Sequence, residues 1–168
     1  RKMVVTSADP AERLVHEINA VPAAREYARM VGKDPEQLSP FLFAENPVVV
    51  RVGGEHHVRA IQKVEENGDL RFYCAIDEGL VLTVAEAKDI VEHIDGALAS
   101  LSDTGAPDLV LGFDCVLRRL EVEQKQLGRK MSDVLSAHRV YGFNTYGEQF
   151  GSKHVNQTFT GLALYPPA

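Results

Sequence analysis

Several features that mark particular protein classes are scarce or missing in this sequence. Cysteine occurs only at Cys74 and Cys115, which argues against a disulfide framework and suits a reducing compartment. No apolar run approaches the ~20 residues that a membrane-spanning helix needs. We therefore expect a soluble, cytoplasmic protein without membrane insertion.

Positive charge is also in short supply. The chain has 18 Lys and Arg against 24 Asp and Glu, which gives a formal net charge of -6. The basic residues are scattered, apart from the pairs Arg118-Arg119 and Arg129-Lys130. Because binding to phosphate backbones needs clustered positive charge, this composition excludes nucleic acid as the main partner.

Motifs of familiar catalytic and metal sites do not occur. The sequence contains neither a Gly-x-Ser-x-Gly elbow nor a Gly-Lys-Ser/Thr phosphate loop. Its six histidines show neither zinc-finger nor HExxH spacing, so we expect no metal site. Without a Cys-x-x-Cys-His motif, any haem would be held noncovalently.

What the chain does contain is enough apolar sequence for one core. At 168 residues and 45% hydrophobic, it is expected to form one domain over residues 1–168, and its first residues suggest a piece of a longer chain. Strands are expected at 3–6, 13–19, 47–52, 58–64, 70–76, 80–82 and 109–113. A first helix is expected at 22–32, and a second, short helix begins after a cap at Asp34. A third is expected from a Thr83/Glu86 capping box to residue 101, and a fourth at 114–135. We predict an α+β fold, a largely antiparallel sheet with helices packed on it, for which a profilin-like sheet is one topology.

Polar side chains concentrate near the C-terminus. Residues 142–150 and 154–161 read as strands joined by a turn at 151–153. Pairing Phe143 with Phe159 makes one face of this hairpin apolar. The other face then places three polar pairs opposite each other: Asn144 with Thr158, Tyr146 with Asn156, and Glu148 with His154. This polar face is either a ligand site or an ordinary exposed face of a sheet.

A second candidate site lies where strand 109–113 passes into a helix. Asp114 is placed to cap that helix and Cys115 lies in its first turn, where backbone N–H groups favour an anion. Arg118 follows one turn later and has the geometry to hold a carboxylate or phosphate. The alternative is structural: Asp114 caps, Cys115 packs and Arg118 pairs with a nearby acid. Arg59 is a second candidate anion contact, or else a solvent-facing charge.

An enzyme can also be assembled from these residues. Cys115 would be the nucleophile, His154 the base, and Glu148 or Asn156 the group that orients the base. Catalysis requires these groups to lie within hydrogen-bond reach of one another, which the sequence does not show. We expect a protein that is not an enzyme.

Several segments together resemble the FIST C domain of signal-transduction proteins. The closing signature is Gly-Phe-Asn-Thr-Tyr-Gly-Glu at 142–148, followed by Asn-Gln-Thr at 156–158 and by Gly161. Upstream, the resemblance includes Val-Arg-Ala-Ile at 58–61, Glu-Gly at 78–79 and residues 113–119, so it covers roughly residues 20 to 164.

This resemblance implies a sensory module for small ligands, for which amino acids have been proposed. It also implies a preceding FIST N domain and an attached signalling output module. Some bacterial relatives look like haem-dependent nitric oxide sensors, and a eukaryotic F-box protein carries a related domain.

We therefore predict a sensory, non-catalytic domain that binds a small molecule, an amino acid or another small anion. Arg118 and Arg59 would hold its anionic group, while Tyr146, Asn156 and Thr158 would orient the remainder. Two alternatives stay open. One is a haem-based nitric oxide sensor, and the other is a protein-interaction module without a small ligand.

Overall fold

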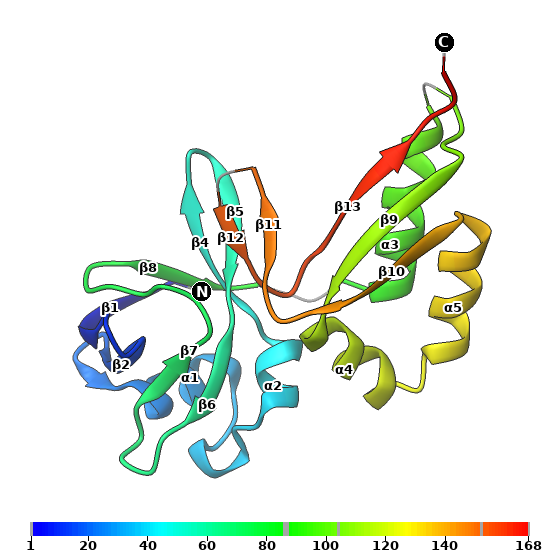
Figure 1. The fold of residues 1–168 in the computed structure, drawn as a ribbon. Coiled ribbons are helices and arrows are strands. Elements are labelled where there is room, and N and C mark those ends of the chain that lie inside the picture. Colours follow the sequence, from blue (N-terminus) through cyan, green and yellow to red (C-terminus); the bar gives the residue numbers. More distant parts are fainter. Residues whose placement is uncertain (1, 86–87, 104, 152, 168) are drawn as a thin grey trace. The chain divides into compact units, whose positions relative to one another are not determined.

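The computed structural model describes residues 2–85, 88–103, 105–151 and 153–167. The chain divides into two compact units, Arg1–Ala87 and Lys88–Ala168, called here the N-terminal and the C-terminal unit. Each is described by itself (Figure 1). The expectation that the whole chain is a single domain of a longer protein stays a prediction.

The N-terminal unit is built on an eight-stranded sheet. Its strands follow the order β5-β4-β8-β1-β2-β7-β6, with β3 paired to β2, and neighbouring strands are antiparallel. The strands are β1 (Lys2–Asp9), β2 (Leu14–Ile18), β3 (Val21–Pro22), β4 (Val48–Val52), β5 (Glu55–Arg59), β6 (Ile61–Val64), β7 (Leu70–Phe72) and β8 (Val81–Val84). The expected single strand at 58–64 is wrong. Residues up to Arg59 pair with β4, whereas residues from Ile61 onwards pair with β7, so the chain forms two strands that are separated at Ala60.

Three short helices accompany this sheet: α1 (Ala23–Val31), the 3-10 turn η1 (Pro35–Gln37) and α2 (Pro40–Glu45). The predicted end of α1 is confirmed, since Gly32 adopts the left-handed conformation (φ 71°) that only glycine enters without strain. Tyr27 of α1 is fully buried against Phe43 of α2, with ring centroids 5.6 Å apart. These helices thus close the apolar core of the N-terminal unit.

The C-terminal unit combines a three-stranded sheet with three helices. Central strand β9 pairs in parallel with β10 and antiparallel with β13, while β11 and β12 form a separate hairpin. The helices are α3 (Ile90–Ala99), the 3-10 turn η2 (Ser100–Ser102), α4 (Val116–Gln124) and α5 (Gly128–Ala137). The strands are β9 (Leu109–Cys115), β10 (Val140–Thr145), β11 (Glu148–Phe150), β12 (Lys153–Val155) and β13 (Phe159–Leu164). Taken together, the two units confirm the predicted α+β class with mostly antiparallel sheet, and a profilin-like topology stays a prediction.

The predicted pairing of Phe143 with Phe159 is wrong. Strand β9 lies between β10 and β13, so that Phe143 pairs with Phe113, which pairs on its other side with Thr160. Within the described residues of 142–161, antiparallel pairing of a hairpin occurs only at β11–β12, where Glu148 opposes Val155 and Gln149 opposes His154. The pairing is therefore shifted by one residue from the predicted one, which moves Glu148 and His154 apart because side chains alternate between faces.

Two predicted helices begin or end elsewhere. The long helix expected at 114–135 is broken into α4 and α5, because Gln126 takes a left-handed conformation (φ 54°) and lets α5 turn back onto β10. The capping box expected at Thr83 is also wrong: Thr83 lies in β8, and Glu86 lies outside the described residues. Helix α3 starts instead at Asp89, whose Oδ1 accepts the backbone N–H groups of Val91 and Glu92 at 2.9 Å each.

The helices cover one face of the three-stranded sheet. Buried side chains from each helix form a core with β9: Ile90, Ile94, Leu98, Val110, Val122 and Met131. On the opposite face, Tyr141, Phe143 and Leu162 are 66%, 63% and 60% exposed. The expected burial of residues 109–113 on both faces is therefore wrong, since burial alternates along β9.

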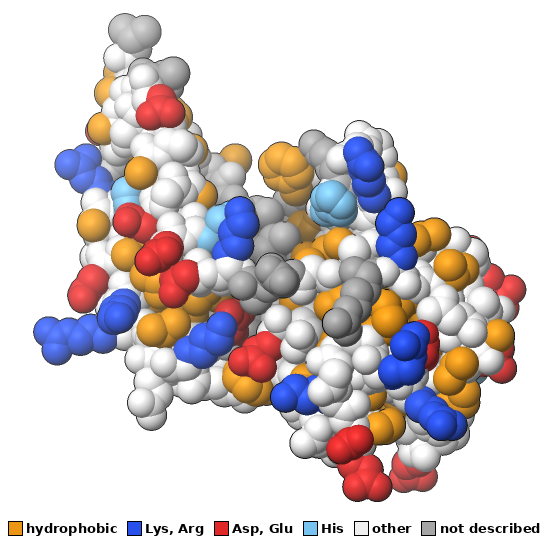
Figure 2. All heavy atoms as spheres, turned by 180° about the vertical axis from the view of Figure 1, so that it is seen from behind, with side chains coloured by type: hydrophobic (Ala, Val, Ile, Leu, Met, Phe, Trp, Pro, Cys, Tyr) orange, Lys and Arg blue, Asp and Glu red, His pale blue; other side chains and the backbone are white. Residues whose placement is uncertain are grey.

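Charged side chains of both signs reach the molecular surface. On the face drawn in Figure 2, acidic and basic groups are interspersed with apolar ones. In the described part of the chain, no helix is long and apolar enough to cross a membrane.

Candidate functional site

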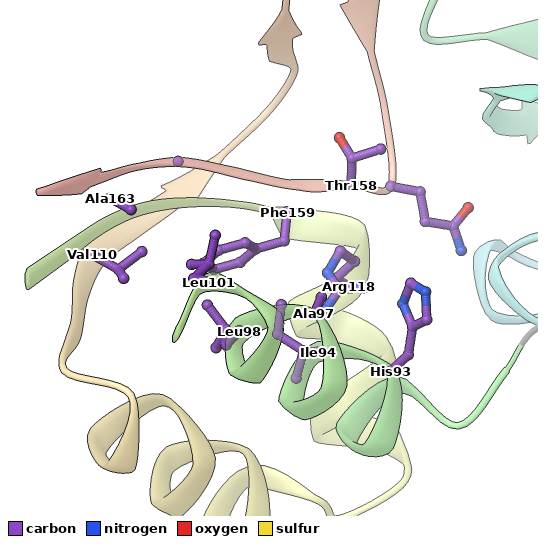
Figure 3. A pocket seen from close by; sticks show the side chains of 12 residues that line it. His93, Ile94, Ala97, Leu98, Leu101, Val110, Arg118, Thr158, Phe159 and Ala163 are labelled. Atoms are coloured by element: carbon purple, nitrogen blue, oxygen red, sulfur yellow. The ribbon is translucent and has the colours of Figure 1, made fainter. Parts of the chain in front are cut away.

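The C-terminal unit contains a cavity of about 360 Å³ between α3 and the helix-facing side of the sheet. Figure 3 shows side chains of α3 and β13 on either side of it, with Arg118 among them. Its volume lies towards the lower end of the range for small-molecule sites, ~300–1,000 Å³. The lining residues are His93, Ile94, Ala97, Leu98, Leu101, Val110, Arg118, Gln157, Thr158, Phe159, Gly161 and Ala163.

Helix α3 supplies one wall. Ile94, Ala97 and Leu98 of α3, continued by Leu101 of the 3-10 turn η2, follow the spacing that places side chains on one face of a helix. Ile94 and Leu98 also belong to the buried core, which fixes this wall in place, while His93 and Ala97 are exposed at its edge. The cavity is thus apolar inside and open to solvent along part of α3.

The sheet supplies the opposite wall. Phe159, Gly161 and Ala163 alternate along β13 and therefore share one face. The ring of Phe159 lies over Gly112 of β9: a Cβ on that glycine would be 2.5 Å from Cζ of the ring. Because residue 112 is a glycine, there is room for the ring of Phe159, which forms part of the cavity wall.

Arg118 brings a positive charge to this apolar cavity. It lies in the first turn of α4 and is only 9% exposed, and its Nε donates to Asp114 Oδ1 at 2.7 Å. Its Nη2 is buried and makes no hydrogen bond within the part of the chain that the structure describes. Burial raises the pKa of Asp114, and the charge of Arg118 opposes that rise. The guanidinium therefore has a carboxylate partner on Nε and a buried nitrogen, Nη2, without a partner among the described residues.

The predicted cap at Asp114 is wrong in detail. The N-cap position of α4 is Cys115, whose side chain makes no capping hydrogen bond, and Asp114 pairs with Arg118. Of the structural alternative, the pairing of Arg118 with a nearby acid and the packing of Cys115 are confirmed, because Cys115 is 1% exposed. Burial also raises the pKa of the Cys115 thiol.

Next to the cavity, a buried carboxylate joins β10 and β11 to Thr158, the residue that precedes β13. Glu148, only 2% exposed, accepts hydrogen bonds from Thr145 Oγ1 at 2.6 Å and from Thr158 Oγ1 at 3.0 Å. Thr158 lines the cavity, and Glu148 is the first residue of β11. A hydrogen bond therefore connects the cavity wall to the β11–β12 hairpin.

The structure places the other predicted site residues away from the cavity lining. Asn144, at the end of β10, donates to the backbone oxygen of Asp114 at 3.3 Å. Tyr146 is 82% exposed, whereas Asn156 is 1% exposed with an Oδ1 that finds no hydrogen bond among the described residues. His154 is exposed and its ring lies close to Gly147.

Arg59 is the one predicted site residue in the N-terminal unit, where it ends β5. Its Nη1 approaches the backbone oxygen of Val58 at 3.5 Å, and its charge lowers the pKa of Cys74 against the larger effect of burial. A role as a ligand contact stays a prediction for Arg59, as it does for the residues outside the cavity lining.

Sequence reasoning missed the α3 wall. The spacing of apolar residues in α3 predicts an amphipathic helix with one buried face. The same spacing occurs in a helix whose buried face is fully packed and in a helix whose face borders a cavity. His93, Ala97 and Leu101 carry no local signal that separates these cases. Their role depends on how closely β13 approaches α3, which is a tertiary distance.

Comparison with known proteins gives a family for the chain. The model of the FIST C domain matches residues 23–151, which is most of the chain and includes parts of both units. No curated protein and no solved structure matches it. FIST C domains are associated with sensory proteins of signal transduction and occur in multidomain signalling proteins. The extent of the match confirms the resemblance seen in the closing signature, and the chain belongs to the FIST C domain family.

Proposed function

We propose that this chain is a sensory, non-catalytic domain that binds a small anion in the α3–β13 cavity. One observation carries the proposal: Arg118 lines an apolar cavity while its buried Nη2 has no hydrogen-bond partner among the described residues. A buried polar group without a partner is destabilising, so a ligand that supplies the acceptor gains both the bond and the relief of that cost. A carboxylate on a guanidinium makes such a bond, typically ~1.5–3 kcal/mol.

The signal would leave the cavity through Thr158. Because this residue lines the cavity and donates to Glu148, a ligand that shifts Thr158 also shifts the start of the β11–β12 hairpin. A small movement of the hairpin would then bias an output module of the full-length protein.

The chemistry around Cys115 supports binding rather than catalysis. A nucleophilic cysteine needs a lowered pKa, because the thiolate is the reactive form. Burial instead raises the pKa of Cys115, and the nearby Glu148 raises it further. His154, the base of the alternative mechanism, is exposed on β12.

The test compares anion binding in two arginine variants. Small carboxylates, amino acids and phosphate are screened by thermal shift against the wild type, Arg118→Gln and Arg119→Gln. Arg119 is the matched control, since it is the neighbouring residue but pairs on the exposed side with Glu123 at 2.7 Å. At 100 times its Kd a ligand stabilises the fold by ~2.7 kcal/mol. We expect this stabilisation in the wild type and Arg119→Gln only. Full stabilisation of a folded Arg118→Gln protein would refute the site.

Haem is a second candidate ligand, favoured by one observation: His93 lines the same cavity as Arg118. A noncovalent haem would be held by the imidazole of His93 on its iron and by the guanidinium of Arg118 on an anionic group. Haem would supply the site that binds nitric oxide. A Soret band in natively purified protein that disappears in His93→Ala and persists in His154→Ala would establish this alternative. Its absence after haem addition would exclude it.

The interaction-module alternative is favoured by the exposed apolar face formed by Tyr141, Phe143 and Leu162. Contiguous exposed apolar surface commonly marks a protein contact. The partner would be the FIST N domain that the family resemblance implies. In size-exclusion binding experiments with that domain, a Tyr141→Ser/Phe143→Ser protein should lose association while anion binding is unchanged. Unchanged association would exclude this face.

A further inference from the structure

The described residues that line the α3–β13 cavity include a positively charged side chain but no negatively charged one. Arg118 is the one permanently charged group among them, and none is acidic. The remaining polar members are His93, Gln157 and Thr158, and the other eight are apolar or glycine. The cavity thus offers compensation for a negative charge and none for a positive charge.

Two acids of the C-terminal unit, Asp114 and Glu148, already accept hydrogen bonds. Asp114 Oδ1 accepts from Nε of Arg118 itself, at 2.7 Å. Both carboxylate oxygens of Glu148 accept hydroxyl groups, one from Thr145 and the other from Thr158. An ammonium group entering the cavity would therefore compete with these hydrogen bonds for the same carboxylates.

From this inventory we propose that the ligand is a monocarboxylate with an apolar body, and that the cavity rejects zwitterionic α-amino acids. The inference rests on the proposed function, because it takes Nη2 of Arg118 as the anchor. One unused guanidinium nitrogen matches one carboxylate. The apolar wall from Ile94, Leu98 and Phe159 receives the body of the ligand.

Position within the cavity makes the discrimination strong. A carboxylate on Arg118 lies at the buried end of the lining, since this side chain is only 9% exposed. The α-ammonium of an amino acid would be held one carbon away, next to a like charge and without a carboxylate among the described lining residues. An unsatisfied buried group typically weakens binding by about tenfold or more, and a charged one by more than a neutral one.

The apolar body makes a second, independent prediction. Each methylene buried against the α3 and β13 walls should strengthen binding by about fourfold until the cavity is filled. Ala97 lies on the exposed edge of α3 and lines the cavity, so Ala97→Leu narrows it at a position where a larger side chain is tolerated by the helix. Ala99 is exposed on the same helix outside the lining, which makes Ala99→Leu the matched control.

The experiment is calorimetric titration of the chain at pH 7 with hexanoate, norleucine and 1-hexanol. Hexanoate and norleucine share the same carbon chain and differ only by the α-ammonium, while hexanol lacks the charge. We expect norleucine and hexanol to bind at least about tenfold more weakly than hexanoate. Butanoate should bind more weakly than hexanoate, and Ala97→Leu should weaken hexanoate while Ala99→Leu leaves it unchanged.

The first of three results would overturn the inference alone, and the other two would overturn the proposed function with it. Norleucine binding as tightly as hexanoate, with loss of norleucine alone in Asp114→Asn, would show that Asp114 holds an ammonium and that the ligand is an amino acid. Hexanoate binding unchanged by Arg118→Gln would show that the carboxylate lies elsewhere. If no anion of the wider screen binds, the failure lies with the anion site and not with the choice of ligand class.

Discussion

Replacing Gly142 by alanine tests whether β10 and β9 approach as closely as the structure shows. Residues Gly142, Gly112 and Gly161 lie in one row across the three-stranded sheet. A Cβ at residue 142 would be 1.8 Å from the backbone oxygen of Gly112 and 2.7 Å from its carbonyl carbon. Because both are backbone atoms, no change of side-chain rotamer relieves the contact.

The magnitude follows from the separation that the methyl group requires. Real Cβ atoms essentially never approach closer than 3.0 Å, so β10 and β9 would have to move apart by about 1.2 Å, the difference from 1.8 Å. A backbone hydrogen bond of ~2.9 Å would lengthen to ~4.1 Å, which breaks it. Two or three lost bonds at ~0.5–1.5 kcal/mol each give a loss of about 1–4.5 kcal/mol in the free energy of unfolding.

The assay is urea unfolding followed by far-UV circular dichroism, with Gly96→Ala as the control. Gly96 lies within α3 with nothing within 4 Å of its added Cβ, so alanine there should raise the free energy of unfolding by up to ~1 kcal/mol. A Gly142→Ala protein as stable as the wild type would refute the close approach of these two strands, and with it the sheet geometry that positions Phe159.

Two further predictions concern stability. Arg29 hydrogen-bonds Glu26 through both carboxylate oxygens and lowers the pKa of Glu26 from 4.5 to about 2. The stabilisation from this ion pair is therefore complete above pH ~4.5 and is lost as pH falls towards 2. When the free energy of unfolding is measured across this pH range, it should decrease less in Glu26→Gln than in the wild type. An equal decrease in both proteins would contradict this role of Glu26. Asp89→Ala removes the cap that accepts Val91 and Glu92 and should lower the free energy of unfolding by ~1 kcal/mol, with Asp89→Asn retaining most of it; equal losses in both would exclude capping as the cause.

Features that depend on residues close together in the chain could be predicted from the sequence. Gly32 ends α1 because it accepts a left-handed backbone, and the Asn67-Gly68 pair turns β6 into β7 because Gly68 does the same (φ 87°). The predicted pairing of Arg118 with a nearby acid is confirmed, since its Nε donates to Asp114, four residues earlier in the chain. The family signature was equally readable.

The pairing of the C-terminal strands could not be predicted in the same way. The sequence favoured joining residues 143 and 159 directly, because neighbouring strands in a chain often pair. The structure instead places β9, from more than 25 residues upstream of β10, between them. The glycine row that allows this approach has meaning only once all three strands are side by side.

Sequence alone thus determined the α+β class, the family, the helix ends set by glycine and the charge that Arg118 brings. Only the tertiary structure decided that α3 and β13 leave a cavity and that Arg118 reaches it with an unused donor. The physical reason is the range of the interactions. Caps, turns and salt bridges four residues apart depend on neighbours in the chain, whereas a cavity depends on the distance between surfaces that many remote contacts hold in place.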